Sequence, residues 1–372
     1  MSKPRVIAFY LPQFYPTPEN DEWWEPGFTE WTNVARAKPL FKGHYQPRIP
    51  RDLSFYDLRV PEVREKQAQL AREAGIEGFC YWHYWFGGGK RALADVFREV
   101  VESGKPDYPF CLCWANHPWC RKTWDPTKPE KVLMPQIYPG KEDFIAHFNE
   151  MLPAFKDSRY MKTEDGRLIF GIYAIHEIKE QQMFKDIWNT LAKENGLKGF
   201  YFFSFAAGKK SLEKNLTNNH ISDSIVYDSM SDVFIRNAEY KVSRNSPLHY
   251  FYALKWRFKK MFGIPPNVVG YSEYVDLAIS TMKQRSNFIP CIVPRWDHSP
   301  RSGMAATILS EDSPKEWGRL CQQTRNFVEA QECNPDNFIF IKAWNEWGEG
   351  NYMEPDGNFG RQYLEESARE FL

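Results

Sequence analysis

The chain has 372 residues, and its 48 basic and 48 acidic side chains cancel to a formal net charge of zero. This balance argues against a nucleic-acid partner and a strongly acidic one, because no global field would steer either of them. The length fits two average domains or one large α/β barrel, and we expect a single domain over 1–372.

The N-terminal residues and the cysteines indicate a compartment. The apolar run before residue 10 is too short for a signal peptide, and no stretch approaches the ~20 apolar residues of a membrane span. Seven cysteines include no C-x-x-C pair, so we expect buried, reduced thiols. We therefore predict a cytoplasmic protein, either free or peripheral at the inner face of the membrane.

Eight β-rich runs alternate with helical stretches along the chain. They span 5–10, 78–82, 110–114, 168–173, 199–205, 224–227, 288–293 and 338–343. Alternating strands and helices imply parallel pairing, and eight is the number of strands that a (β/α)8 barrel requires. The sequence therefore predicts the α/β fold class, as a single (β/α)8 TIM barrel.

Polar and aromatic residues follow the ends of these strands. In a (β/α)8 barrel the loops at the carboxyl ends of the strands form the active site, so these residues should surround one cleft. In chain order the candidate binding residues are Tyr10, Gln13, His83, Trp85, Asn116, Tyr173, Arg295, Trp296 and Asp297. An internal ion pair between Arg295 and Asp297 is an equally good interpretation. His83 and His117 lack the spacing of a metal site, and we expect no metal.

The stretch 208–270 has the least regular pattern, and we interpret it as an elaborated insertion in the barrel. Within it, residues 250–262 place Phe251, Leu254, Phe258, Met261 and Phe262 on one helical stripe, with three lysines off the stripe. A helix that contacts a membrane surface would have this pattern. An ordinary barrel helix with a basic outer face would have it too, and we favour that interpretation.

The last predicted strand runs into a loop rich in carboxylates and tryptophan. Glu346 and Glu349 lie three residues apart beside Gly348 and Gly350, so their carboxyl groups can converge. A glycosidic bond needs one carboxyl at the leaving oxygen and a second at the other face, and indole rings cover the C–H faces of a sugar. We expect Glu346 and Glu349 to be catalytic. Their neighbours Trp344, Asn345 and Trp347 should contact the sugar.

Asn-Glu-Trp-x-Glu-Gly at 345–350, followed by Glu-Pro at 354–355, resembles the motif of the glycoside hydrolase family 99 endo-α-mannosidases. More closely, it resembles the WbsX-type proteins of bacterial surface polysaccharide gene clusters. Further blocks at 9–14, 23–24, 27–33, 46–47, 52–58, 78–83 and 294–297 extend the resemblance over nearly the whole chain. Trp31, in one of these blocks, joins the expected glycan contacts.

The resemblance also implies roles for the two glutamates. By position, Glu346 would deprotonate the 2-hydroxyl of the sugar to give a 1,2-anhydro intermediate, and Glu349 would serve as general acid and then as base. The chain has Gly348 where the hydrolases usually carry histidine. We expect no cofactor.

Three functions compete. WbsX-type proteins are generally described as glycosyltransferases of O-antigen (lipopolysaccharide) or capsule assembly, so the resemblance implies glycosyl transfer on a glycan, including a lipid-linked one. A retaining hydrolase similar to the endo-α-mannosidases is the close alternative. A non-catalytic carbohydrate-binding barrel is the rival from another class, and the intact carboxylate pair argues against it. We predict glycosyl transfer.

Overall fold

The computed structural model describes residues 3–121, 130–235, 267–331, 334 and 336–372, and also 254, 257, 258, 261 and 262. Eight parallel strands form a barrel in the order β1, β13, β11, β9, β8, β7, β4 and β2, and β2 pairs with β1 to close it. The strands are β1 (Arg5–Tyr10), β2 (Gly78–Gly87), β4 (Phe110–Trp114), β7 (Leu168–Ile172), β8 (Phe200–Ala207), β9 (Ser224–Asp228), β11 (Ile289–Ile292) and β13 (Phe338–Ile341). The predicted barrel is confirmed, and each predicted strand overlaps one of these eight.

Helices cover the outside of the barrel and also form part of its loops. The described helices are α1 (Pro18–Trp23), α2 (Glu30–Arg36), α3 (Pro61–Glu73), α4 (Ala94–Ser103), α5 (Lys141–Phe155), α6 (Gln181–Glu194), α7 (Lys209–Asn218), α8 (Met230–Ile235), α10 (Tyr271–Gln284), α11 (Ser299–Ser302), α12 (Pro314–Glu329) and α13 (Gln362–Phe371). Three short 3-10 turns are η1 (Ile175–Glu177), η2 (Gly303–Ala305) and η3 (Trp347–Glu349).

The remaining strands are short and lie in the loops. β3 (Lys90–Ala92) pairs antiparallel with β2, and β5 (Trp119–Arg121) pairs antiparallel with β6 (Lys131–Met134). β10 (Asn267–Gly270) lies parallel to β12 (Thr307–Ser310). β14 (Asn345–Glu346) and β15 (Asn351–Tyr352) form the hairpin that carries the two candidate catalytic glutamates.

Local sequence sets the ends of the long helices. α3 begins with Pro61 at its first position, where the missing N–H has no helical partner to lose, and Gly75 follows its end with φ of 78°. α12 begins after Ser313, whose side chain accepts a hydrogen bond from the N–H of Glu316 at 3.2 Å. These signals fix where each helix turns back toward the barrel.

Aromatic side chains fill the inside of the barrel. Phe9 on β1 stacks on Trp82 of β2 with ring centroids 4.5 Å apart, and it meets Phe205 of β8 and Phe340 of β13 at 5.5 and 5.4 Å. Because side chains alternate along a strand, the residues next to these rings point outward to the helices. This alternation decides which residues reach the rim from inside.

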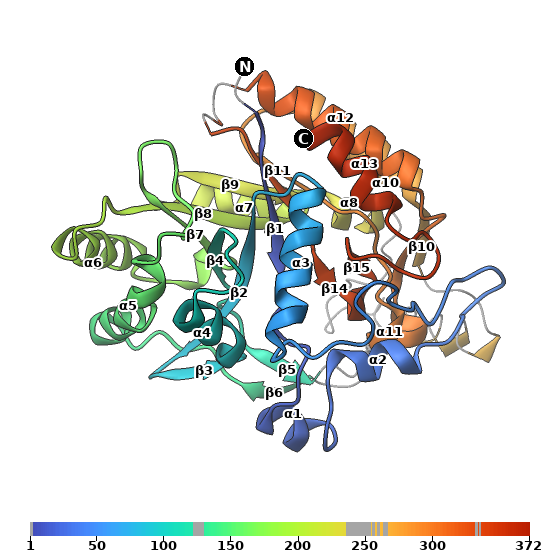
Figure 1. Ribbon diagram of the computed structural model, residues 1–372, viewed down its shortest axis with the longest axis horizontal. Coiled ribbons are helices and arrows are strands. Elements are labelled where there is room, and N and C mark those ends of the chain that lie inside the picture. The colour runs from blue at the N-terminus through green and yellow to red at the C-terminus, as the bar shows by residue number, and fades with distance from the viewer. Residues whose placement is uncertain are drawn as a thin grey trace.

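One end of the barrel is built up by loop elements. Figure 1 shows β1 running from the N-terminal end of the chain toward α1, where α1, α2, α11 and the β5–β6 hairpin gather. This is the end at which the barrel strands finish. Both ends of the chain lie toward the opposite side, near α12. The elaborated end therefore holds the candidate site, as the barrel fold predicts.

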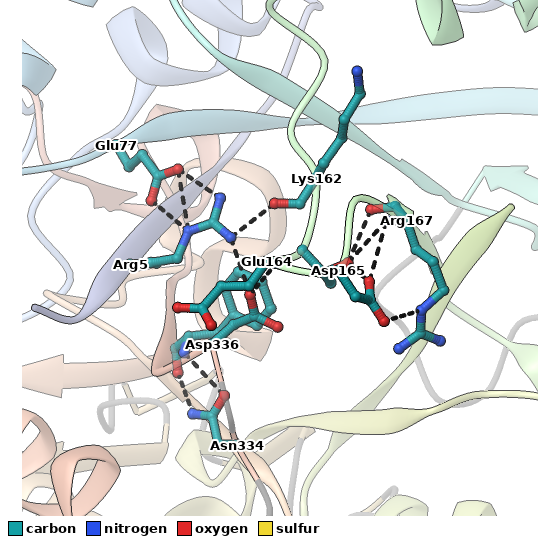
Figure 2. Close-up of polar contacts among 10 residues, drawn as sticks. Arg5, Glu77, Lys162, Glu164, Asp165, Arg167, Asn334 and Asp336 are labelled. Carbon is teal, nitrogen blue, oxygen red and sulfur yellow. Dashed lines mark hydrogen bonds and ion pairs between the residues drawn. The ribbon is translucent and has the colours of Figure 1, made fainter. Parts of the chain in front are cut away.

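A polar network joins the strands at the opposite end (Figure 2). Arg5, at the start of β1, donates to Glu77 just before β2 at 2.7 Å and to the carbonyl oxygen of Lys162 at 2.8 Å. Asp336, just before β13, accepts from Arg5 at 3.3 Å and from the N–H of Glu164 at 2.7 Å. These contacts tie together the segments that lead into β1, β2, β7 and β13.

The stretch 208–270, interpreted as an insertion, contains α7, β9, α8 and β10, whereas most of 250–262 lies outside the described residues. In the ranges that the structure describes, no helix is both long and apolar enough to cross a membrane. The described cysteines form no disulfide. That the whole chain is one domain stays a prediction.

Candidate active site

Two asparagines hold the loop that follows β13. The side chain of Asn345 accepts from the N–H of Leu11 at 2.8 Å and donates to its carbonyl oxygen at 3.0 Å. The side chain of Asn351 accepts from the N–H of Ala343 at 3.0 Å. The loop is therefore tied to the end of β1, and its glutamates extend from a fixed backbone.

Glu346 is almost fully buried, with 6% of its surface exposed. Trp82, inside the barrel, donates its indole N–H to Oε1 of Glu346 at 2.8 Å. Burial, and after it the negative charge of Glu349, raises the pKa of Glu346 to about 8. Glu346 therefore holds a proton at neutral pH.

Glu349 has the opposite electrostatic surroundings. Nη1 of Arg301, on α11, donates to Oε1 of Glu349 at 2.5 Å, and Nε2 of His298 lies 3.9 Å from the same oxygen. Burial opposes ionisation, but the charges of Arg301 and Lys342 outweigh it and lower the pKa of Glu349 to about 2. Glu349 is therefore ionised, and the two glutamates together hold one proton.

Lys342, which follows β13, brings a second cation to the pair. Its Nζ lies 3.8 Å from Oδ2 of Asp228, the last residue of β9, and 5.0 Å from the ring centroid of Trp296. Burial disfavours the charged ammonium, but Asp228 and both glutamates raise the pKa of Lys342. The site thus contains alternating acids and bases that stabilise one another.

Two of the predicted binding residues lie at the carboxylates. Tyr173 stacks on Phe205 with centroids 5.3 Å apart and meets Trp82 edge-on at 5.8 Å. Trp296 lies beside Lys342, as described above. Gln13, beyond the end of β1, is half-buried.

Tyr10, His83 and Trp85 point outward to the helices and do not reach the carboxylates. The hydroxyl of Tyr10 donates to Gln67 of α3 at 2.7 Å, and Nε2 of His83 lies 2.8 Å from Nε2 of His147 on α5. Trp85 lies flat on the same His147, with centroids 4.8 Å apart. Strand alternation is the physical reason, because their neighbours in sequence face inward.

Asn116, Arg295 and Asp297 are fully buried and bind protein groups. Asn116 accepts from the N–H of Ala174 at 2.7 Å, and Arg295 donates to Asp356 at 2.5 Å. Asp297 has its own polar partners, which are His44, Gln46 and Ser299. Arg295 and Asp297 therefore do not form the internal ion pair with each other, and all three residues hold loops in place behind the site.

Trp31, Trp344 and Trp347 are also buried, at 8%, 0% and 0% exposure. The indole N–H of Trp347 donates to Glu354 at 2.6 Å, and that of Trp31 donates to the carbonyl oxygen of Tyr56 at 2.7 Å. The rings of Trp31 and Trp347 lie 5.5 Å apart. These tryptophans form a packed wall under the loop and present almost no surface to a ligand.

Sequence reasoning missed four groups at the carboxylates, which are Glu30, Trp82, Arg301 and Lys342. Asp228 is recognisable from the sequence as the end of a strand, but it was not among the candidate binding residues. Glu30 and Trp82 stand inside blocks that carried the resemblance, and Lys342 lies just before the glutamate loop. No motif or strand end in the sequence points to Arg301. In the parts of the chain that the structure describes, no group of three or more His, Cys, Asp and Glu side chains is arranged to hold a metal.

Sequence comparison identifies relatives over nearly the whole chain. The model of the family described as Glycosyltransferase WbsX matches residues 6–367. Two proteins, each named Uncharacterized protein WxcX, come from two strains of Xanthomonas campestris pv. campestris, and each is 32% identical over 377 residues. The match covers 97% of this chain and 48% of each relative, so the chain spans about half the length of these curated relatives.

Structural comparison identifies the same barrel in carbohydrate-active proteins. A glycoside hydrolase-like protein aligns with a TM-score of 0.56 and 15% identity, covering 100% of this chain and 94% of that chain. A family 99 endo-α-mannosidase from Bacteroides thetaiotaomicron aligns with a TM-score of 0.50 and 13% identity, covering 98% and 95%. At these identities the likeness shows the fold alone.

Proposed function

The chain belongs to the WbsX glycosyltransferase family, and on that premise we propose that it transfers a glycosyl group in the assembly of a bacterial surface polysaccharide such as O-antigen or capsule. Family and fold together make it a carbohydrate-active enzyme. The observation that carries the finer proposal is the pair Glu346 and Glu349 at the rim, where Trp82 donates to Glu346 and Arg301 donates to Glu349, so that the pKa of the first is raised and that of the second is lowered. One acid and one base are what glycosyl transfer with retention requires.

The proposed reaction has two steps and follows the roles that the resemblance implies. Glu346 removes the proton of the 2-hydroxyl, whose oxygen attacks C1 while Glu349 protonates the leaving oxygen. Glu349 then takes the proton of the acceptor hydroxyl, which attacks C1 and opens the 1,2-anhydro ring, and Glu346 returns a proton to the 2-oxygen. Both carboxyls end as they began, and two displacements at C1 retain its configuration.

Without substrate, the two carboxyls have the protonation state that the first step of the reaction produces. At rest the proton lies on Glu346 and the charge on Glu349, so the surrounding groups favour the anhydro intermediate. We infer that the bound 2-hydroxyl donates a hydrogen bond to Glu346 and stabilises the ionised form of that carboxyl. The proton of Glu346 then moves to Glu349. The two carboxyls are hydrogen-bonded to each other, so the transfer is direct.

Hydrolysis by the same pair is the second candidate. Water would replace the acceptor hydroxyl in the second step, and the fold is shared with an endo-α-mannosidase. Gly348 stands where the hydrolases that the motif resembles usually carry histidine, and this difference counts against hydrolysis.

A lipid-linked substrate at the inner face of the membrane is part of the proposal. Large apolar side chains along one stripe are mostly exposed, at 67% for Leu254, 51% for Phe258, 70% for Met261 and 59% for Phe262. The same stretch carries Lys255, Arg257, Lys259 and Lys260. Exposed apolar side chains flanked by basic ones suit an anionic lipid surface, which supports the interfacial interpretation of 250–262.

A screen tests the proposed function directly. Wild type and Glu349→Gln are incubated with a panel of glycans, lipid-linked glycans and nucleotide sugars, and the products are detected by mass spectrometry. We expect the wild type to extend a glycan by one or more sugars and Glu349→Gln to be slower by ~10²-fold to 10⁴-fold. Release of free sugar without an extended product would favour hydrolysis. Binding of glycan without any product from the wild type would favour the non-catalytic barrel.

A further inference from the structure

Glu30 is a buried charge at the site that the reaction above does not use. It lies on α2 with 4% of its surface exposed, and its Oε2 accepts two hydrogen bonds from Arg301, from Nε at 3.1 Å and from Nη2 at 2.9 Å. Arg301 donates through Nη1 to Glu349 at 2.5 Å. Arg301 is therefore shared between Glu349 and a second carboxylate.

The glutamate loop leaves space for Glu30. A Cβ added at Gly348 would lie 2.0 Å from Oε2 of Glu30 and 3.0 Å from Nε of Arg301. Real Cβ atoms do not approach oxygen this closely, so any side chain at position 348 would displace the pair of Glu30 and Arg301.

Acids and bases lie around Glu349 on several elements. They are Glu30 of α2, Tyr84 of β2, Tyr173 after β7, Asp228 of β9, His298 and Arg301 at α11, Lys342 after β13, and Glu346 of β14. Both strong cations in this set have an acid partner besides the catalytic pair. Asp228 forms an ion pair with Lys342, and Glu30 forms an ion pair with Arg301.

We propose that Glu30 is a positioning residue that holds Arg301 and offsets its charge, so that the pair of Glu346 and Glu349 keeps its shared proton at neutral pH. This inference rests on the proposed function, which needs that proton for acid and base catalysis. Without the charge of Glu30, Arg301 would act on the pair alone and favour its doubly ionised form. Two of the hydrogen bonds of Arg301 would also lose their charged acceptor.

The test is a pH titration of the carboxyl pair without any substrate. Glutamate labelled with ¹³C at the side-chain carboxyl is followed by NMR, and the pair is assigned from the signals lost in Glu346→Gln and Glu349→Gln. In the wild type the upper apparent pKa of the pair should lie near 8. Glu30→Gln should lower it by about one unit or more, because a neighbouring negative charge has been removed.

Two further variants complete the design. Glu30→Asp keeps the negative charge, but its shorter side chain holds the carboxylate farther from Arg301. The upper pKa of the pair should therefore fall by less than in Glu30→Gln. This variant also serves if Glu30→Gln does not fold. Glu25→Gln removes an exposed acid that pairs with Arg36 nearby and should leave the titration unchanged.

An upper pKa that rises or stays constant in both Glu30 variants overturns the inference. A titration that shifts as predicted, in a protein that forms no glycan product, would contradict the proposed function alone.

Discussion

At the scale of single residues, the two glutamates differ because their partners differ. Glu349 accepts directly from the guanidinium of Arg301, whereas the donor to Glu346 is the neutral indole N–H of Trp82. Glu346 is buried and 16% of the Glu349 side chain is exposed, so both are largely shielded from water and the partner decides which one can remain charged. The asymmetry gives one acid and one base.

The raised pKa of Glu346 predicts how stability depends on pH. A carboxyl whose pKa rises on folding stabilises the folded state fully below its unfolded pKa of 4.5, and that contribution is lost as the pH rises through about 8. Between pH 5 and pH 8 the unfolding free energy of the wild type should therefore fall by a few kcal/mol more than that of Glu346→Gln, because a difference of one in pKa corresponds to ~1.4 kcal/mol. Chemical denaturation at several pH values measures this. Glu25→Gln should follow the wild type, and parallel curves for wild type and Glu346→Gln would contradict the assignment.

The sequence could identify the glutamate pair but could not choose correctly among its neighbours. Every residue of β2 is buried, so hydrophobicity does not tell which face of the strand points inward. As polar or aromatic residues at a strand end, His83 and Trp85 are predicted from the sequence to reach the site, whereas in the structure Trp82 does so. Asn116, Arg295 and Asp297 illustrate the same limit, because a polar residue at the rim can bind loops as well as ligands.

At the scale of elements, the barrel strands can be predicted from the sequence, because apolar runs that alternate with helices are compatible with few folds other than a parallel sheet or barrel. The short rim elements do not. α2 and α11 lie far apart in the chain, and Glu30 and Arg301 bring them together at η3. Such long-range pairs leave no periodic pattern in the sequence, so neither the position of these helices nor the shared Arg301 could be predicted.

The exposed side chains of Leu254, Phe258, Met261 and Phe262 predict binding to anionic membranes. The wild type should sediment with vesicles that contain phosphatidylglycerol and remain largely unbound to vesicles of phosphatidylcholine alone, because both apolar and basic groups contribute. Replacing Phe258 and Met261 together by glutamate should reduce the bound fraction at least several-fold. Met183→Glu is the matched control, since Met183 is also exposed, at 42%, but lies on α6. Equal binding by all three proteins would contradict the proposal.

At the scale of the whole molecule, the two ends of the barrel have separate tasks. The end with α1, α2 and α11 holds the charged site, whereas the network of Arg5 joins strand starts at the other end (Figure 2). In barrels of this kind the first end varies with chemistry and the second maintains the closed sheet. Changes at the Arg5 end should therefore affect stability without affecting the reaction.

Arg5→Ala tests that separation. It removes charge-assisted hydrogen bonds to Glu77 and Asp336 and should cost roughly 1–3 kcal/mol of unfolding free energy. Arg59→Ala is the control, because Arg59 is exposed and pairs only locally with Asp57, so its loss should cost about 0–1 kcal/mol. Denaturant unfolding measures both. A loss of activity in folded Arg5→Ala, without a loss of stability, would contradict the division between the two ends.

We propose that Glu346 and Glu349 make or break a glycosidic bond, so variants of the two residues should differ in how their rates depend on the leaving group. Turnover of glycosyl donors with activated and with poor leaving groups is compared in wild type, Glu346→Gln and Glu349→Gln. Glu349→Gln should lose ~10²-fold to 10⁴-fold with poor leaving groups and far less with activated ones, which need no protonation. Glu346→Gln should fail with both, and a 2-deoxy donor should be inert with the wild type. Near wild-type turnover by both variants would contradict the claim.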